Sequence, residues 1–139
     1  MSIDGLDDAT IRRILTDTRR IAVVGASPRP VRPSNEVLHF LVRRGYEVTG
    51  VNPGIAGRPL HGRPVVGRLE EAAPLDMVDL FRNSRNVGPV VDGAIRLGAN
   101  TVWMQLGVID EDAAARARAE GITVVMDRCP VIEVRRLGL

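Results

Sequence analysis

The residues with the clearest capacity for chemistry lie between Ile21 and Asn35, in the sequence IAVVGASPRPVRPSN. The first four are apolar and rich in β-branched side chains, and Gly25 ends the run, which predicts a buried parallel strand. Ser34 or Asn35 is expected to be the N-cap of the helix that follows. A strand, a glycine turn and a helix N-terminus together present backbone N–H groups that favour an anion. We therefore expect this loop to hold the phosphates of a nucleotide-containing ligand.

Further candidate side chains follow the other predicted core strands, which cover residues 46–51, 77–81, 101–104 and 122–126. In parallel sheets, ligands bind beyond the carboxyl ends of the strands, so these residues are expected to converge. They are Asn52, Pro53, Phe81, Arg82, Gln105, Gly107, Asp127 and Cys129. Structural alternatives exist: Ser27 and Asn52 as turn formers, Gln105 as a backbone partner, and Phe81 as a core residue.

The elements that must position these residues alternate between strand and helix. Helices are expected at about 8–18, 34–44, 87–97 and 111–120, with a short edge strand at 64–66 and a final turn or helix at 131–139. This alternation predicts an α/β fold: a Rossmann-like three-layer sandwich with a doubly wound, mainly parallel sheet. The chain is expected to form a single domain, 1–139, with its core at 20–130.

All 19 basic residues are arginines, and the chain contains no lysine. That excludes Schiff-base chemistry and a P-loop lysine. Arginine makes bidentate contacts to phosphate, although a solvated surface role is the alternative for each one. The arginines in predicted loops are Arg29, Arg32, Arg58, Arg63, Arg68, Arg82 and Arg85. The net charge of +2 does not indicate a nucleic-acid partner.

The cysteine and histidine content excludes several classes of site. Cys129 is the only cysteine, so no internal disulfide forms, and a reducing compartment is expected. Cys129, His39 and His61 are too widely spaced for a recognisable zinc pattern. The N-terminus lacks the features of a signal peptide, and no apolar run has the length of a membrane span. We therefore expect a cytoplasmic protein without a membrane partner.

The glycine loop differs from the dinucleotide fingerprint G-x-G-x-x-G. Ser27 stands where the second glycine would be, and Asn52 follows the second strand where an acidic residue would hold the ribose hydroxyls of NAD. An NAD(P)-binding domain is thus an alternative that these two residues disfavour. A neutral Asn52 suits a more heavily phosphorylated ligand.

Five segments resemble the small stand-alone CoA-binding domain proteins, whose fold is similar to the N-terminal domain of succinyl-CoA synthetase α subunits. The resemblance covers about residues 20–130 and implies that the chain binds coenzyme A or an acyl-CoA. The synthetases also use a phosphorylated histidine in a second domain, and because no such domain is expected here, a non-catalytic role is expected. The segments are IAVVGASPRPVRPS (21–34), VTGVNPG (48–54), DMVDLFRNS (76–84), TVWMQLGV (101–108) and VVMDRCP (124–130).

The same resemblance implies a role for each candidate residue. Gly25, Ala26 and Ser27 would meet the diphosphate, with Ser34 and Asn35 at the helix N-terminus. Arg32 or Arg58 would meet the ribose phosphate, because the synthetase lysine is absent here. Asn52 and Pro53 would lie beside the adenosine, Phe81 and Arg82 would flank the adenine or pantetheine, and Gln105, Leu106 and Gly107 would border the pantetheine arm.

A second functional hypothesis concerns the thiol of Cys129. It follows the last predicted strand at the expected ligand edge, and the neighbouring Arg128 could favour its thiolate form. A CoA-linked thiol-redox protein is therefore a further alternative, against a buried and inert cysteine. The sequence leaves the oligomeric state open between a monomer and a homodimer, although small α/β domains with an exposed sheet edge often associate.

Overall fold

The computed structural model describes residues 2–139 and contains one six-stranded sheet in the order β3-β2-β1-β4-β5-β6. The five strand pairs of this sheet are all parallel, which confirms the predicted Rossmann-like α/β fold. The strands are β1 (Arg20–Val24), β2 (Glu47–Val51), β3 (Val65–Val66), β4 (Met77–Leu80), β5 (Thr101–Met104) and β6 (Thr123–Val125).

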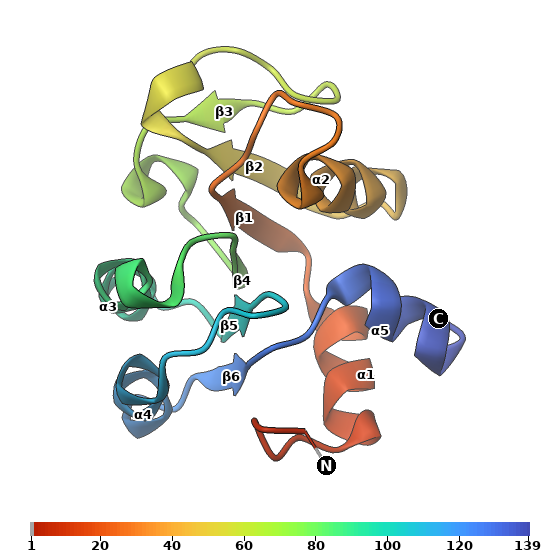
Figure 1. Ribbon diagram of the computed structural model, residues 1–139, viewed down its shortest axis with the longest axis vertical. Coiled ribbons are helices and arrows are strands. Elements are labelled where there is room, and N and C mark those ends of the chain that lie inside the picture. Colours follow the sequence, from red (N-terminus) through yellow and green to blue (C-terminus); the bar gives the residue numbers. More distant parts are fainter. Residues whose placement is uncertain (1) are drawn as a thin grey trace.

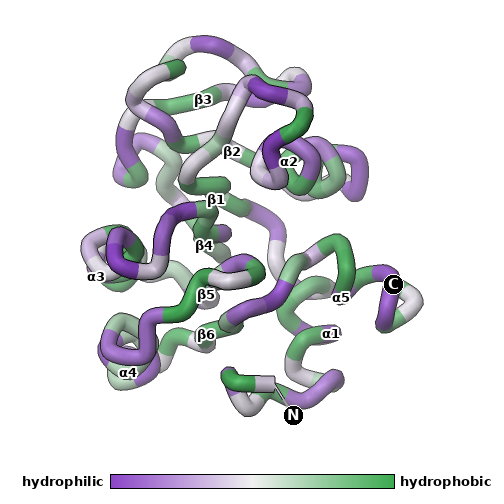
Figure 2. Tube along the Cα trace, in the orientation of Figure 1, coloured by the Kyte–Doolittle hydropathy of each residue, from purple (hydrophilic) through white to green (hydrophobic). Residues whose placement is uncertain are grey.

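Five α-helices cover the two faces of the sheet in the described chain (Figure 1). One face carries α3 (Gly88–Arg96) and α4 (Glu111–Ala119), and the other carries α1 (Asp8–Asp17), α2 (Pro33–Arg43) and α5 (Pro130–Leu137). Hydrophobic residues concentrate in the strands and in the helix sides that face them (Figure 2). Each face therefore has its own apolar core, with Val78 in one and Met77 in the other.

The start of α2 differs from the prediction. The helix begins at Pro33 and its N-cap position is Arg32, so Ser34 and Asn35 lie inside the first turn rather than capping it. Proline is well suited to the first helical position, because its fixed φ is helical and it has no N–H to leave unpaired. Asn35 is free to use its side chain elsewhere, and it does so at the loop before the helix.

The C-terminal segment forms a helix, α5, which packs against α1 and α2. Arg128 ties its start to the N-terminus: the guanidinium donates to Asp4 at 2.9 Å and to Glu133 at 2.6 Å, and all three side chains are at most 10% exposed. Burial alone would raise the pKa of Asp4, but the hydrogen bonds from Arg128, Leu6 and Met126 hold it at about 2. The two ends of the chain are thus joined beside β6.

The strand order creates a crevice at the carboxyl end of the sheet. β1 and β4 are neighbours, yet the chain leaves β1 toward α2 on one face and leaves β4 toward α3 on the other. The connections therefore diverge and leave a gap between them. A ligand site is expected at this switch point.

The remaining elements are short 3-10 turns: η1 (Pro53–Ile55), η2 (Leu69–Ala72) and η3 (Ser84–Asn86).

Candidate functional site

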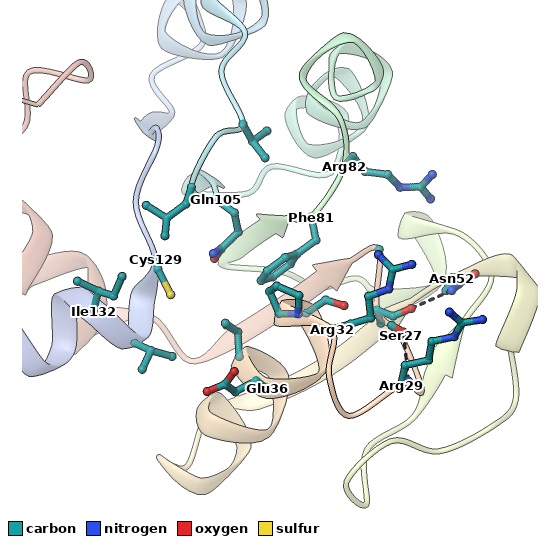
Figure 3. A pocket seen from close by; sticks show the side chains of 18 of the residues that line it. Ser27, Arg29, Arg32, Glu36, Asn52, Phe81, Arg82, Gln105, Cys129 and Ile132 are labelled. Atoms are coloured by element: carbon teal, nitrogen blue, oxygen red, sulfur yellow. Dashed lines mark hydrogen bonds between the residues drawn. The ribbon is translucent and has the colours of Figure 1, made fainter.

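A cavity of about 710 Å³ lies at this crevice, over the carboxyl ends of β1, β4 and β5. Its walls come from the β1–α2 loop, the first turns of α2, the segments after β4 and β5, and the start of α5 (Figure 3). Nine of the residues proposed from the sequence line it: Gly25, Ala26, Ser27, Arg32, Ser34, Asn52, Phe81, Arg82 and Gln105.

Gly25 allows the β1 loop to pass directly over β4. Its φ is +89°, and a Cβ at this position would lie 2.3 Å from the carbonyl oxygen of Phe81. The backbone N–H of Gly25 also donates to the carbonyl of Val51, at 3.0 Å. Only glycine combines this conformation with such a close approach, so Gly25 sets how near the loop lies to the neighbouring strand.

Asn52 holds the same loop from the side of β2. Its amide nitrogen donates to the carbonyl of Ala26 at 2.8 Å, and its amide oxygen accepts from the N–H of Gly54 at 2.8 Å. Ser27 then turns the loop, because its hydroxyl accepts from the N–H of Arg29 at 3.2 Å. These hydrogen bonds fix the shape of the loop. They involve Ser27 and Asn52, two polar residues that follow strands in the sequence.

Asn35 supports the loop from below without lining the cavity. Its amide nitrogen donates to the carbonyl of Ser27 at 2.8 Å, which leaves its oxygen to accept from Nε2 of His61 at 2.9 Å. The His61 ring is stacked on His39, with 4.0 Å between the ring centroids. Partial burial and the neighbouring His39 lower the pKa of His61, so the neutral ring that donates to Asn35 is favoured.

Three further predicted residues do not line the cavity. Pro53 and Arg58 are exposed in and after η1, beyond Asn52. Gly107 shapes the loop after β5: its N–H donates to the carboxylate of Asp127 at 2.7 Å, and its carbonyl accepts from Ser84 at 3.3 Å. The contact between Gly107 and Asp127 joins the ends of β5 and β6.

The cavity wall also contains residues that the sequence does not single out as ligand contacts. They are Pro33, Glu36 and Val37 from α2, Val131, Ile132 and Arg135 from α5, and Asn83 and Val108. Arg29, Leu106 and Cys129, which are candidates from the sequence, line the cavity as well. The α5 residues follow helical spacing, which signals a helix face but not the surface that the face contacts.

The cavity has two chemically different sides. Four arginines but only one acidic residue, Glu36, line it. Figure 3 shows Arg29 and Arg32 near Ser27 and Asn52, with Arg82 above them on the same side, whereas Gln105, Cys129 and Ile132 lie on the opposite side. Ile132 is 49% exposed and Leu106 is 56% exposed, so the second side offers apolar surface to an occupant.

Arg128 does not have the role expected beside Cys129. Its guanidinium donates to Asp4, Glu133, the Ser2 hydroxyl and the carbonyl of Leu6. Two carboxylates therefore balance the charge of this guanidinium. Cys129 itself is 9% exposed and lines the cavity.

No cluster of three or more histidine, cysteine, aspartate or glutamate side chains among residues 2–139 could hold a metal ion. Over the same residues, no helix is both long and apolar enough to cross a membrane.

Comparison with known proteins gives close relatives along nearly the whole chain. An uncharacterized protein of Bacillus subtilis, YneT, is 37% identical over 121 residues, which are 87% of this chain and 89% of that protein. A solved structure of a hypothetical protein from Pyrococcus horikoshii superimposes with a TM-score of 0.93 at 37% identity, covering 100% of this chain and 97% of that one.

A second solved structure, from Thermus thermophilus, has a TM-score of 0.89 at 33% identity and covers 95% of this chain and 99% of that one. The family model described as CoA binding domain matches residues 19–135. This match spans every strand of the sheet and every segment that lines the cavity. The chain therefore belongs to the CoA binding domain family.

Proposed function

We propose that this protein binds coenzyme A or an acyl-CoA in the cavity between the β1 loop and α5. The observation that carries the proposal is the placement of Arg29, Arg32 and Arg82 on one side of the cavity and of Cys129 and Ile132 on the other, where α5 also contributes Arg135. Coenzyme A has the same division, with three phosphate groups at its nucleotide end and an uncharged pantetheine arm that ends in a thiol. The complementary ends orient the ligand.

In this proposal the backbone of Gly25, Ala26 and Ser27 meets the diphosphate at the N-terminal end of α2, where the helix dipole favours an anion. Arg32 meets the ribose phosphate, with Arg29 and Arg82 nearby, because arginine matches phosphate in a bidentate manner. The pantetheine arm runs past Phe81 toward Gln105 and Leu106. Asn52 acts by holding the loop.

The proposed role is binding rather than turnover. The titratable side chains that line the cavity are Glu36, Cys129 and the four arginines. Nucleophilic catalysis requires a nucleophile within hydrogen-bond reach of a base. No hydrogen bond of this kind joins Cys129 to a base in the described chain, so the lining supplies contacts rather than a catalytic pair.

Thermal unfolding against a ligand panel tests the proposal. A ligand present at 100 times its dissociation constant adds about 2.7 kcal/mol of stability. We expect coenzyme A and acetyl-CoA to raise the melting temperature, dephospho-CoA to raise it less, and NAD and NADP to leave it unchanged. A shift with NAD alone would favour the dinucleotide alternative, and no shift with any CoA species contradicts the proposal.

Arginine variants identify the ribose phosphate contact. Arg32→Gln is expected to reduce the affinity for coenzyme A about tenfold, while its affinity for dephospho-CoA stays near that of the wild type. Arg58→Gln is the competing candidate, and a loss confined to that variant would assign the contact to Arg58. Arg43→Gln, at the far end of α2, is the control for a general change in charge.

A second candidate function uses the thiol of Cys129, because this thiol lines the same cavity. Its thiolate would attack one sulfur of CoA disulfide, forming a mixed disulfide with one CoA and releasing the other as a thiolate. Intact-protein mass spectrometry after incubation with CoA disulfide is expected to show one reducible CoA adduct. The adduct must be absent in Cys129→Ser, and its absence in the wild type rejects this function.

A further inference from the structure

Three side-chain oxygens of the described residues are buried without a hydrogen-bond partner, and they belong to only two residues. They are both carboxyl oxygens of Asp79 and Oε1 of Gln105. Asp79 is 0% exposed in the central strand β4, and Gln105 is 5% exposed directly after β5. A buried acceptor without a donor is strongly unfavourable. We therefore expect each of these two residues to have a hydrogen-bond donor as its partner in the folded protein.

The sheet register places these two side chains on the same face of neighbouring strands. Asp79 is paired with Trp103, and Gln105 follows Trp103 by two residues. A rise of ~3.3 Å per residue and a strand spacing of ~4.8 Å put their Cα atoms about 8 Å apart. An aspartate and a glutamine side chain can together span this distance.

The strand residues that flank Asp79 on this face have no donor to offer. Val23 of β1, paired with Asp79, is apolar. Trp103 uses its indole N–H for the carbonyl of Arg128, at 2.8 Å. Met77 and Phe81, two residues before and after Asp79 on its own strand, are also apolar. A protonated carboxyl group at Asp79 would supply the missing donor itself.

We propose that Asp79 is a carboxylic acid in the folded protein and that its O–H donates a hydrogen bond to Oε1 of Gln105. One bond then satisfies the Gln105 oxygen and gives the acid a partner. Burial favours this protonation state, because it raises the pKa of Asp79 well above its usual range. Asp79 is thus a positioning residue that acts through Gln105.

The bond fixes which end of the Gln105 amide faces the cavity. With Oε1 held by Asp79, the NH2 group points into the cavity, where Figure 3 shows the side chain ending between Cys129 and Phe81. An N–H donor at this place suits a carbonyl oxygen: an amide of the pantetheine arm or the thioester of an acyl-CoA. This last step rests on the proposed function, whereas the Asp79–Gln105 bond does not.

Infrared difference spectroscopy tests the bond without a ligand. The spectrum of the wild type minus that of Asp79→Asn at pH 7 is expected to contain the C=O band of a protonated carboxyl group. In Gln105→Leu this band should move to higher frequency, because the acid loses its acceptor. A carboxylate band in its place, or an acid band that Gln105→Leu does not move, overturns the proposal.

Ligand titrations test the positioning role. Asp79→Leu is expected to weaken coenzyme A binding about three- to tenfold, but to leave adenosine 3′,5′-bisphosphate, which has no pantetheine arm, unaffected. Asp79→Asn should restore the affinity, because its amide N–H can donate to the same oxygen. Circular dichroism checks that both variants are folded, and Gln105→Leu gives the same selective loss if either is not.

The outcomes separate the two proposals. Equal coenzyme A affinity for the wild type and folded Asp79→Leu, or equal losses for both ligands, overturns the role of Asp79. Failure of the wild type to bind coenzyme A at all would instead reject the proposed function, and the infrared result would still decide the Asp79–Gln105 bond.

Discussion

At the scale of single residues, the path of the loop after β1 depends on the absence of a Cβ atom at Gly25. Gly25→Ala places a Cβ 2.3 Å from the Phe81 carbonyl, in a backbone conformation that already disfavours side chains. We expect it to lower the free energy of unfolding by about 3 kcal/mol or more and to abolish coenzyme A binding. Urea denaturation and ligand titration measure the two effects.

Gly45→Ala is the matched control for this variant. Gly45 has φ +92°, close to that of Gly25, but nothing lies within 4 Å of the place that a Cβ would take there. Gly45→Ala should lower the free energy of unfolding only by the cost of an alanine at a positive φ, about 1–2 kcal/mol. Equal losses in the two variants would show that the contact with Phe81 is unimportant.

The buried carboxyl of Asp79 predicts a pH dependence of stability. Because burial raises the pKa of Asp79 in the folded state above its ordinary value of 3.8, the folded protein binds this proton more tightly than the unfolded chain. The stabilisation that this proton gives the folded protein is fully present below about pH 4, and it declines as the pH rises toward the raised pKa of Asp79. Asp79→Asn should flatten this decline in urea unfolding measured at pH 5–9, and an unchanged slope would contradict the assignment.

At the scale of elements, Arg128 fixes α5 and the N-terminal segment to the sheet. Arg128→Met leaves the buried carboxylate of Asp4 without its cation and leaves Glu133 paired with Arg136 alone, so we expect a loss of about 3–5 kcal/mol in urea unfolding. The control is Arg116→Met, whose partner Asp92 is 42% exposed; its loss should stay below about 1 kcal/mol.

The ion pairs of Arg128 with Asp4 and Glu133 also predict how the free energy of unfolding changes at acid pH, the acid limb of the stability curve. The pKa of Asp4 is lowered from 3.8 to about 2 in the folded state, so its contribution is present above about pH 4 and is lost as the pH falls toward 2. Arg128→Met should weaken this acid dependence. An acid limb as steep in the variant as in the wild type would mean that other carboxyl groups produce it.

At the scale of the whole molecule, the cavity is assembled from segments far apart in the chain. Coenzyme A is therefore expected to protect backbone amides from hydrogen exchange at residues 25–29, 81–83, 105–108 and 129–132 together. Residues 98–100 and 121–123, at the amino ends of β5 and β6, serve as the internal control and should be unaffected. Protection spread evenly over both edges would indicate a general stabilisation instead of occupancy of this cavity.

The sequence by itself determined the order and type of the elements, the ends of the strands and the special place of Gly25. These features follow from local rules: hydrophobic periodicity, β-branched runs and glycine at positions that need a positive φ. The polar strand ends could be aligned in advance because parallel strands present their carboxyl ends at one edge. For that reason nine of the proposed residues meet around one cavity.

Only the tertiary structure decided the roles that depend on contacts between distant residues. The sequence predicts Ser34 or Asn35 as the cap of α2, but both lie inside the helix, and the Asn35 side chain bonds to Ser27 and His61. It likewise predicts that Arg128 acts on Cys129, whereas Arg128 pairs with Asp4 and Glu133. The contribution of α5 to the cavity and the burial of the Asp79 carboxyl without a hydrogen-bond partner also depend on contacts between distant residues. Burial and hydrogen-bond partners arise from packing between elements, and no spacing within one segment encodes them.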